Sequence, residues 1–444
     1  MKLPLVDTSQ VFPILRSHLL VDGFDLVLDL EHSKCGYFVD ARSGRRYVDM
    51  FSCFASLPLS LNHPDIRTPE FIEQLGTIAL HKITNSDLYT HVYATFVETL
   101  FRIAVPSPPF KYAFFVEGGA LANENALKIA FDWKVRKNFR KGYTREVGHR
   151  VLHFRQAFHG RSGYTLSLTN TDPTKTAYFP KFDWPRIINP KLHFPLTEES
   201  LAQTIADEKL AIKQIETALR EHGDDIAALI IEPIQGEGGD NHFRPEFLQQ
   251  LRRICDEHDI LLIFDEVQTG VGITGTWWAY EQMGVVPDIM TFGKKMQVCG
   301  LVCTERIDDI PDNVFHVSSR INSTWGGNIV DMARATAFLE IIARRGYLDN
   351  ARQIGEYLQS QLIQLGETYP QLISNPRGRG LFCAFDLPSP QVRKDFLQRC
   401  FAEGLLVLGS GERSVRFRPT LDITRQRIDE AIAIMDKVLR LMGT

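Results

Sequence analysis

The middle of the chain consists of short apolar runs that alternate with longer stretches in which apolar residues recur every three or four positions. Residues 261–264 and 289–292 are continuous apolar runs of strand length, which is typical of buried strands. The same pattern predicts strands at 112–116, 151–154 and 228–231. Strands that alternate with helices indicate an α/β fold with a mostly parallel sheet covered by helices on both faces.

Two of the intervening stretches have the apolar spacing of amphipathic helices. Residues 121–135 form the first, and its apolar face consists of Ala126, Leu127, Ala130 and Phe131. Residues 244–258 form the second, with Pro245 in the first turn, where proline is favoured. Its apolar face consists of Phe247, Leu248, Leu251, Ile254 and Cys255.

Segments near both ends of the chain have a different pattern. Residues 36–40 and 46–50 flank a glycine-containing turn, which predicts a hairpin. Beyond about residue 331 helical patterns dominate, and 380–387 and 415–418 are predicted to be strands. We expect these later segments to form a second, smaller domain.

The composition of the 444 residues is that of an ordinary globular protein, with 44% hydrophobic and 23% charged residues. A net charge of -4 gives no electrostatic reason to expect nucleic acid or an anionic membrane as a partner. No apolar run approaches the ~20 residues of a membrane span, and the first residues lack the apolar core of a signal peptide. The seven cysteines are scattered without the spacing of a zinc site, so we expect buried free thiols and no metal. Such thiols favour a reducing compartment, and we expect a cytoplasmic protein.

An acid and a lysine follow the two central apolar runs. Asp265 and Glu266 come directly after 261–264, and Lys294 and Lys295 follow 289–292 after a single glycine. Ligands of open α/β sheets collect at the carboxyl ends of the strands. Pyridoxal 5'-phosphate (PLP) fits this arrangement, because its aldehyde forms a Schiff base with a lysine and its pyridine nitrogen pairs with an anion.

Each of these residues also has an alternative interpretation. Asp265 could pair with a structural arginine or with backbone amides, since a buried carboxylate needs some partner. Glu266 points to the opposite face of an extended chain, whereas Gln268 could reach the hydroxyl of the ring. Lys294 and Lys295 compete for the Schiff base, or both are solvated surface lysines, although the apolar run before them disfavours that alternative.

Three further motifs could complete such a site. The Gly-Gly-Ala stretch 118–120 precedes a predicted helix whose free N–H groups could bind phosphate, or it is an ordinary turn. Phe158 could stack on a flat ring, or it belongs to the core with His159 as a structural histidine. The polar stretch 322–328 could give a hydroxyl to the phosphate, or it is a turn before a helix.

A dinucleotide site is the competing interpretation of the same region. Residues 270–275 match the spacing G-x-G-x-x-G. That motif normally begins where a strand ends and opens a helix. Here residues 265–269 intervene and two tryptophans follow, so a nicotinamide or flavin enzyme ranks well below a PLP enzyme.

Seven segments together resemble the class III PLP-dependent aminotransferases, in the order of that family and over nearly the whole chain. They are GGALANENALK at 118–128, FHGRSGYTLS at 158–167, IEPIQGEGGD at 231–240, FDEVQTGVGITG at 264–275, FGKKMQVCG at 292–300, NSTWGGN at 322–328 and RFRP at 416–419. The resemblance implies PLP fold type I, with a large PLP-binding domain and a smaller α+β domain built from both termini. We therefore expect 61–330 to form the large domain, and 1–60 with 331–444 to form the smaller one.

The resemblance also implies a homodimer with composite active sites, and roles for individual residues. Lys294 matches the Schiff-base lysine, and Asp265 matches the acid on the pyridine nitrogen. Gln268 matches the neighbour of the ring oxygen, and Phe158 matches the stacking aromatic. The phosphate ligands that it implies are Gly119, Ala120 and, from the other subunit, Thr324.

On the substrate side, Arg161 matches an arginine that holds a substrate carboxylate, and Glu237 and Arg416 match a switch pair. Asn322, from the segment NSTWGGN, is expected to contact the substrate as well. Within the class, the resemblance is greatest to enzymes that move the ε-amino group of L-lysine to 2-oxoglutarate by a ping-pong mechanism. The implied products are 2-aminoadipate 6-semialdehyde and L-glutamate.

Three alternatives stay open at this point. Aminotransferases for 4-aminobutyrate and ornithine share the ring, phosphate and lysine residues. A PLP-dependent isomerase or epimerase of the same fold would need no amino acceptor, and the presence of both Arg161 and Arg416 disfavours it. A catalytically silent PLP-binding protein is disfavoured by the intact Lys294 and Asp265.

Overall fold

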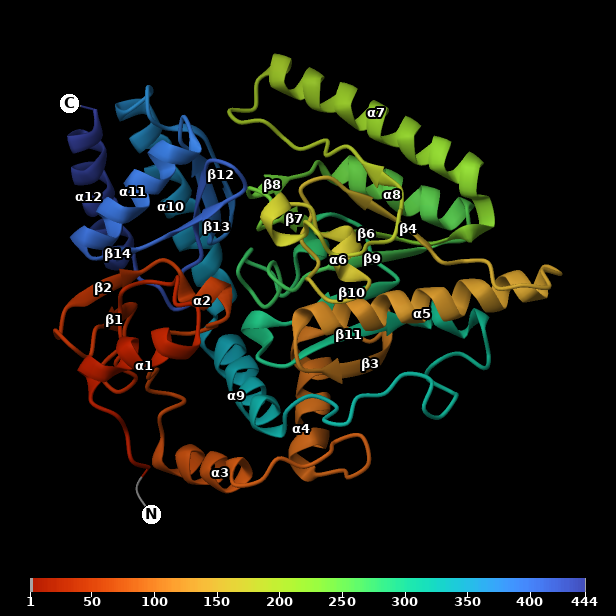
Figure 1. The fold of residues 1–444 in the computed structure, drawn as a ribbon, viewed down its shortest axis with the longest axis horizontal. Coiled ribbons are helices and arrows are strands. Elements are labelled where there is room, and N and C mark those ends of the chain that lie inside the picture. The colour runs from red at the N-terminus through yellow and green to blue at the C-terminus, as the bar shows by residue number, and fades with distance from the viewer. Residues whose placement is uncertain (1–2, 444) are drawn as a thin grey trace.

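A seven-stranded sheet forms the centre of the computed structural model, which describes residues 3–443 (Figure 1). The strand order is β3-β11-β10-β9-β6-β4-β5, and four of the six neighbouring pairs are parallel. The strands are β3 (Phe110–Val116), β4 (Arg150–Phe154), β5 (Arg186–Ile187), β6 (Ile226–Ile231), β9 (Leu261–Asp265), β10 (Ile289–Phe292) and β11 (Cys299–Thr304). The predicted mostly parallel sheet is therefore confirmed, and its antiparallel pairs are β10–β11 and β11–β3.

Helices cover both faces of this sheet because the central strands are apolar on both sides. One face packs against α5 (Gly119–Arg140) and the other against α7 (Glu198–His222) and α8 (Pro245–Glu257). Alternate residues of one strand serve the two faces: Leu261 and Ile263 lie in the cluster with α5, whereas Leu262 and Phe264 lie in the cluster with α8. The result is an α/β sandwich of three layers.

The predicted strands and helices of this region are all present, with small shifts at their ends. Helix α5 extends beyond the predicted 121–135 at both ends. The expected turn at 118–120 is wrong in part, because Gly119 and Ala120 already belong to the first turn of α5. Gly118 precedes the helix with φ 116°, a conformation that glycine adopts without strain. The 25-residue α7 was not predicted.

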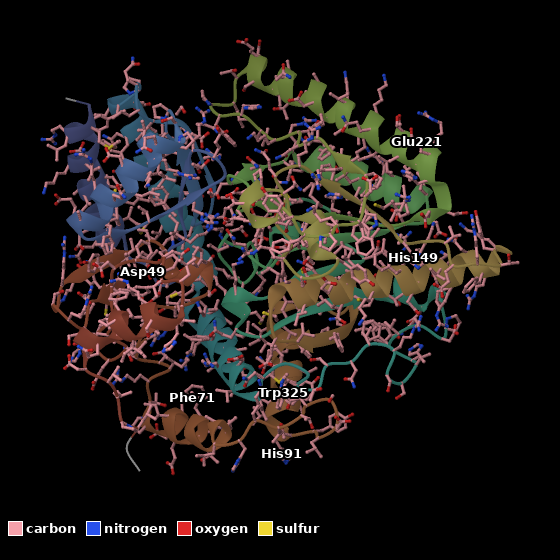
Figure 2. All side chains as sticks on the ribbon, in the orientation of Figure 1. Asp49, Phe71, His91, His149, Glu221 and Trp325 are labelled. Atoms are coloured by element: carbon pink, nitrogen blue, oxygen red, sulfur yellow. The ribbon has the colours of Figure 1, made fainter. Side chains whose placement is uncertain are left out.

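Both ends of the chain meet beside this sandwich. The predicted hairpin is confirmed as β1 (Tyr37–Val39) and β2 (Arg46–Asp49), and β14 (Leu405–Leu406) extends it by pairing parallel to β2. Figure 2 shows Asp49 on the red N-terminal ribbon, next to the blue C-terminal ribbon. A second, four-stranded sheet contains β12 (Ser374–Arg379), β13 (Phe382–Asp386), β15 (Leu408–Ser410) and β16 (Ser414–Phe417). The predicted strands at 380–387 and 415–418 are present, while the domain boundaries stay a prediction.

Other elements connect these sheets. The longer ones are α9 (Ile329–Arg345), α10 (Tyr347–Thr368), α11 (Pro390–Glu403) and α12 (Arg425–Met442). The shorter helices are η1 (Thr8–Gln10), α1 (Val11–His18), α2 (Ser52–Ala55), α3 (Pro69–Ala79), α4 (His91–Thr99), η2 (Leu100–Ala104), α6 (Thr165–Leu168), η3 (Pro173–Lys175), η4 (Gly223–Asp225), η5 (Ala279–Gln282), η6 (Lys294–Met296) and η7 (Glu305–Asp309). The short strands β7 (Ile234–Gln235) and β8 (Asn241–His242) pair with each other.

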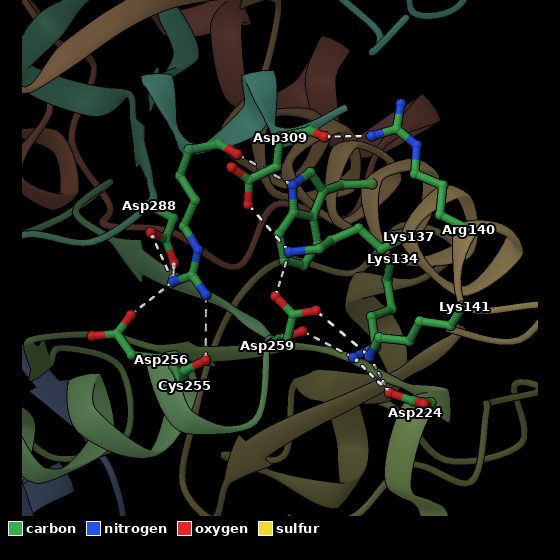
Figure 3. A network of polar contacts seen from close by, with 12 residues as sticks. Lys134, Lys137, Arg140, Lys141, Asp224, Cys255, Asp256, Asp259, Asp288 and Asp309 are labelled. Atoms are coloured by element: carbon green, nitrogen blue, oxygen red, sulfur yellow. Dashed lines mark hydrogen bonds and ion pairs between the residues drawn. The ribbon is translucent and has the colours of Figure 1, made fainter. Parts of the chain in front are cut away.

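The C-terminal half of α5 is fixed by a buried polar network (Figure 3). Lys134 is fully buried and donates a hydrogen bond to the carbonyl oxygen of Asp259 at 2.9 Å. Its Nζ also lies 3.3 Å from Oδ1 of Asp224, which Lys141 contacts at 2.9 Å. Burial lowers the pKa of Lys134. These contacts tie the C-terminal half of α5 to Asp259 in the turn before β9 and to Asp224 in η4.

All seven cysteines are free, as expected, but they are not all buried. Cys255, Cys303, Cys383 and Cys400 are buried, Cys53 and Cys299 are half-buried, and Cys35 is exposed. Among the described residues, no helix combines the length and the apolar character needed to cross a lipid bilayer.

Candidate active site

Five strands end at one edge of the sheet, and a cavity of about 610 Å³ opens there. Strands β3, β4, β6, β9 and β10 run in the same direction, so their carboxyl ends meet. The cavity is lined by residues that follow these ends and by neighbouring loops: Ser56, Gly119, Ala120, Asn123, Phe158, His159, Gly160, Arg161, Glu232, Glu237, Asp265, Val267, Gln268, Lys294, Gln297, Cys299, Asp331 and Arg334. Seven of the predicted site residues are therefore brought close to Asp265 by the fold.

Asp265 ends β9 with only 4% of its surface exposed. Its Oδ2 accepts hydrogen bonds from Asn123 Nδ2 at 2.7 Å and contacts His159 Nδ1 at 2.8 Å. Its Oδ1 accepts one bond, from the backbone N–H of Val267 at 3.1 Å. Neither arginine nor a second carboxylate is its partner among these contacts. The carboxylate is thus held rigidly, and Oδ1 keeps capacity for a further donor in the cavity.

The residues around Asp265 form a second layer of hydrogen bonds. Asn123 accepts a bond from Thr291 Oγ1 at 2.7 Å, and Thr291 is the residue of β10 that lies in register with Asp265. His159 is buried, and its Nε2 has no hydrogen-bond partner among the described residues. Burial raises the pKa of Glu232 to about 7, against the opposing influence of His159. The site therefore concentrates buried ionisable groups, which is common at functional sites.

Lys294 follows β10 and Gly293 and lines the same cavity. Its backbone has φ 47°, in the left-handed region that residues with side chains rarely adopt. Burial lowers the pKa of its amine, the charge of Asp265 opposes that effect, and the charge of Arg416 adds to it. A lowered pKa favours the neutral amine that attacks an aldehyde.

Lys295 occupies a different environment. Only 2% of its surface is exposed, and Nζ donates a hydrogen bond to the carbonyl oxygen of Ala55 at 3.1 Å. It is absent from the lining of the cavity. Between the two competing lysines, the geometry favours Lys294 as the residue that meets a ligand, and neither is a solvated surface lysine.

The first turn of α5 gives the cavity a group of free backbone donors. Gly119 and Ala120 are its first two residues, and the N–H groups of a first helical turn have no partner within the helix. The fold brings other segments very close to this turn. A Cβ atom at Gly160 would lie 2.5 Å from Cβ of Ala120, so a side chain there would push the turn out of place. An anion such as a phosphate fits these donors.

Phe158 and Gln268 line the cavity from two sides. The backbone N–H of Phe158 donates to Oε1 of Glu232 at 2.9 Å, which fixes the segment that carries the ring. Gln268 Oε1 accepts two bonds from Arg418, both at 3.1 Å. Arg418 in turn pairs with the fully buried Asp240 at 2.7 Å. Gln268 therefore has a fixed orientation toward the cavity, with its amide nitrogen available as a donor.

Arg161, Glu237 and Arg416 are the candidate substrate residues. Arg161 lines the cavity, is exposed to it, and has no ion-pair partner among the described residues. Arg416 is almost fully buried and pairs with Glu237 at 2.8 Å, while its Nε has no hydrogen-bond partner within the described part of the chain. Glu237 also accepts a bond from Lys175 Nζ at 2.6 Å. Burial works to raise the pKa of Glu237, but Arg416 and Lys175 outweigh burial and hold that pKa below its ordinary value.

Three predicted residues are absent from the lining of the cavity. Arg416 is one of them, although it pairs with the lining residue Glu237, and the other two are Thr324 and Asn322. Thr324 is exposed, and its carbonyl oxygen accepts a bond from Ser86 Oγ at 3.1 Å. Asn322 is also exposed, and its side chain accepts a bond from the backbone N–H of Ser323. The roles of Thr324 and Asn322 stay predictions. Thr324 was assigned to the phosphate bound by the other subunit, and Asn322 was assigned to the substrate.

Several lining residues were not predicted from the sequence. Asn123 is the one with the clearest geometric role, because it joins Asp265, Thr291 and the carbonyl oxygen of His159. Its position four residues after Gly119 places both on one side of a helix, which could have identified it. The others are Ser56, Gly160, Glu232, Val267, Gln297, Cys299, Asp331 and Arg334. Cys299 belongs to β11 and Asp331 and Arg334 belong to α9, whereas the rest lie in connecting segments.

The residues present fit PLP. Free helix N–H groups suit a phosphate, an aromatic ring and a glutamine suit a flat ring with a hydroxyl, and Asp265 suits a ring nitrogen. Lys294, with its lowered pKa, suits an aldehyde. The dinucleotide alternative lacks its structural context, since 270–275 is followed by turns and the short η5 rather than by a long helix.

Comparisons with known proteins give a consistent result. The model of the aminotransferase class-III family matches residues 23–439. The L-lysine-epsilon aminotransferase of Mycobacterium tuberculosis is 51% identical over 432 residues, 97% of this chain and 95% of that protein. The human mitochondrial 4-aminobutyrate aminotransferase is 32% identical over 412 residues, 88% of this chain and 80% of that protein. The solved structure of lysine aminotransferase from M. tuberculosis has a TM-score of 0.96 at 50% identity, covering 98% of this chain and 100% of that chain.

The charges around Lys294 predict opposite pH shifts for two variants. Asp265→Asn removes a negative charge that raises the pKa of Lys294, so this pKa should fall in the variant. Covalent capture of added PLP should therefore reach half its maximal rate at a lower pH than in the wild type. Arg416→Gln removes a charge that depresses the same pKa, so its midpoint should move to higher pH. Stopped-flow absorbance of the apoprotein across a pH series measures both midpoints. Arg377→Gln, at another buried arginine, is the control, and shifts of the same sign in the two test variants would contradict the assignment.

Proposed function

Because this chain belongs to the class-III aminotransferase family, we propose that it transfers the ε-amino group of L-lysine to 2-oxoglutarate. The observation that carries the proposal is the 51% identity, over 97% of the chain, to an L-lysine-epsilon aminotransferase. PLP is the cofactor of the family, and it acts as an electron sink when bound. The products would be 2-aminoadipate 6-semialdehyde and L-glutamate.

Within one chain, the groups that would hold PLP follow the carboxyl ends of β3, β4, β9 and β10. Lys294 would carry it covalently, and Asp265 would pair with the ring nitrogen and keep it protonated. Phe158 would lie against the ring and Gln268 beside its hydroxyl. The phosphate would be bound by the backbone of Gly119 and Ala120, with Thr324 from a second subunit. Asn123 and His159 keep Asp265 in place for this role by holding its Oδ2.

Lys294 has a second task in the reaction. With the cofactor bound to the substrate, the Nζ of Lys294 would be free to take the proton from the ε-carbon of the substrate lysine. The same Nζ would then hold that proton for return to the adjoining carbon of the cofactor. A general base of this kind must be neutral at the working pH and must lie next to the carbon. The buried position of Lys294 lowers its pKa, which supports that role.

Two substrates of different charge must use this one cavity. L-Lysine presents an uncharged methylene chain near Lys294 and a single carboxylate far away. 2-Oxoglutarate has a carboxylate at each end. Arg161 would bind the distal carboxylate of both, because a guanidinium group binds carboxylate bidentately. Arg416 would bind the second carboxylate of 2-oxoglutarate only.

The Glu237–Arg416 pair supports this division of roles. In the structure the pair is closed, so Arg416 is neutralised, as the lysine half-reaction requires. The free Nε of Arg416 leaves a donor for a substrate carboxylate. Lys175 gives Glu237 a second cationic partner, so the carboxylate would remain paired after it leaves Arg416. The structural alternative is a permanent ion pair.

We further propose a cytoplasmic homodimer. The free cysteines support a reducing compartment. Large apolar side chains are exposed near the loop of Thr324 and near the start of α5, as a subunit interface requires: Leu80, Leu88, Tyr89, Leu121 and Trp325. The backbone N–H of Asn85 donates to the carbonyl oxygen of Trp325 at 3.2 Å, so the two exposed loops form one surface.

The proposed activity predicts a ranking of amino donors. With 2-oxoglutarate as acceptor, L-lysine should give the highest kcat/KM for glutamate formation, ahead of ornithine and 4-aminobutyrate. A Lys294→Ala variant should form no glutamate, because both the covalent anchor and the base are lost. A coupled glutamate assay on the PLP-loaded protein measures this. A higher kcat/KM with 4-aminobutyrate than with L-lysine would show that the assigned amino donor is wrong, although the family assignment would still hold.

The charge switch predicts opposite defects in the two half-reactions. Glu237→Gln should slow the lysine half-reaction by roughly 150- to 5,000-fold, because an unpaired buried charge costs about 3–5 kcal/mol. Arg416→Gln should instead slow the glutamate half-reaction. Single-turnover absorbance with each amino donor alone resolves the two. The control is Asp386→Asn, which breaks the buried pair with Arg377 at 2.8 Å and should affect both half-reactions equally. Equal losses for Glu237→Gln as well would support a permanent ion pair.

The composite site predicts complementation between two inactive proteins. Lys294→Ala lacks the lysine, and Thr324→Asp places a carboxylate against the phosphate, so neither should be active alone. A mixed dimer has one site that takes Lys294 and Thr324 from the two different chains. Random reassembly should restore about a quarter of wild-type activity, because half of the dimers are mixed and each has one intact site of two. No recovery, with mixed dimers verified by mass spectrometry, would show that Thr324 does not act across an interface.

A further inference from the structure

A turn of left-handed backbone lies beside the cavity. In α2 the residues Ser52, Cys53, Phe54 and Ala55 have φ values of 40°, 53°, 61° and 67°. None of them is glycine. Residues with a side chain enter this region singly and at a cost, and a run of four persists only when the surroundings hold it. Strained backbone of this kind needs surrounding contacts to hold it, and it is common at functional sites.

Two buried charged residues hold the turn at its ends. Oδ1 of Asp49 accepts hydrogen bonds from the backbone N–H groups of Phe51 and Ser52 at 2.9 Å and 2.7 Å. At the other end, Lys295 Nζ donates to the carbonyl oxygen of Ala55 at 3.1 Å. Each of the two charged side chains is only 2% exposed. Burial raises the pKa of Asp49 to about 6 and lowers that of Lys295 to about 7, and the charge of each opposes the shift of the other.

The turn is also bonded to the two segments that carry the reacting lysine and the candidate switch arginine. Gln297, three residues after Lys294, donates from Nε2 to the carbonyl oxygen of Ser56 at 2.8 Å. On the other side, Ser52 Oγ donates to the carbonyl oxygen of Arg418, two residues after Arg416. The turn therefore spans the space between these two segments. Figure 2 shows Asp49, at the start of this connection, where the N-terminal and C-terminal ribbons meet.

The turn lies directly beside the wall of the cavity. Ser56, the residue that follows the turn, lines the cavity. Phe54 is 52% exposed, and its ring lies 5.8 Å from the guanidinium carbon of Arg416. The ring of Phe51 supports it edge-on at 4.9 Å. A shift of the turn would move Phe54 relative to Arg416 and would change the path between Lys294 and the carboxylate-binding arginines.

We propose that Lys295 is a positioning residue for substrate binding: with Asp49 it locks the left-handed turn 52–55, and the locked turn sets the wall beside Arg416. Burial of a lysine amine costs more free energy than one hydrogen bond to a carbonyl group returns, and methionine would fill a similar volume without a charge. The function of the amine here is to hold a strained segment in one conformation. The inference rests on the proposed function only for the identity of the amino donor.

The test compares two buried lysines that make the same kind of bond. Lys295→Met and Lys134→Met each remove a buried amine that donates to a backbone carbonyl oxygen, at Ala55 and Asp259 respectively. Lys134 lies about 22 Å along α5 from Gly119, by the rise of an α-helix, and belongs to the network of Figure 3. Both variants should lose thermal stability. Only Lys295→Met should speed hydrogen exchange of the backbone amides of 51–56, measured by mass spectrometry.

The kinetic prediction separates positioning from general stability. Lys295→Met should raise KM for the amino donor about tenfold and change kcat much less, with PLP still bound at one per chain. Lys134→Met should leave KM unchanged. If Lys295→Met does not fold, Asp49→Asn tests the same lock, because the amide bonds to Oδ1 can remain while the charge that faces Lys295 is lost. That variant should show the same two changes to a smaller degree.

Unchanged exchange at 51–56, or an equal rise of KM in Lys134→Met, would overturn the proposal. The exchange measurement and the PLP content do not depend on which amino donor the enzyme uses. If the wild type fails to use L-lysine, KM is measured with the donor that it does use. These measurements distinguish a wrong assignment of the amino donor from a wrong assignment of Lys295 as a positioning residue.

Discussion

The central constraint of this structure is that Asp265 and Lys294, at the ends of adjacent parallel strands, share one cavity. Register places Asp265 opposite Thr291, three residues before Lys294, so the two charged groups reach the same edge of the sheet. An isolated buried carboxylate and a buried amine are both costly. Asp265 offsets its cost with Asn123, His159 and the N–H of Val267, whereas Lys294 keeps its amine free and has its pKa lowered by burial. The fold therefore holds the acid and leaves the base available.

This difference explains why two neighbouring lysines have different roles. Lys294 faces the cavity and has no hydrogen-bond partner for its amine among residues 3–443, and its left-handed backbone turns the chain at that point. Lys295 then points away into the protein and bonds Ala55. The strain at Lys294 and the strain at 52–55 lie in contact, because Gln297 and Lys295 join the two segments. Strain concentrated at a functional site indicates that the surrounding structure fixes these positions.

Elements with strong local patterns could be predicted from the sequence, and contacts that depend on tertiary structure could not. The strand at 289–292 was predicted to the residue, because a continuous apolar run between polar turns leaves few alternatives. Asp265, Phe158, Gln268 and Lys294 could be placed together because parallel strands share one carboxyl edge. Glu232, Asp331 and Arg334 could not, since they reach the cavity from segments whose positions depend on packing. Thr324 and Asn322 lie outside the cavity of one chain, so their assignment depends on a second subunit.

Two buried ion pairs of this molecule differ in the bonds that hold their members. Arg377 and Asp386 form a pair with further bonds to Asn375, Ser414 and the backbone of Gly239, so several bonds hold each charge in place at the same time. Arg416 and Glu237 differ, because Arg416 keeps an unpaired Nε and Glu237 has a second cation in Lys175. A pair can exchange partners at low cost only if each member has somewhere else to bond. The local chemistry of Glu237 and Arg416, rather than burial alone, makes this the pair suited to alternate between two substrates.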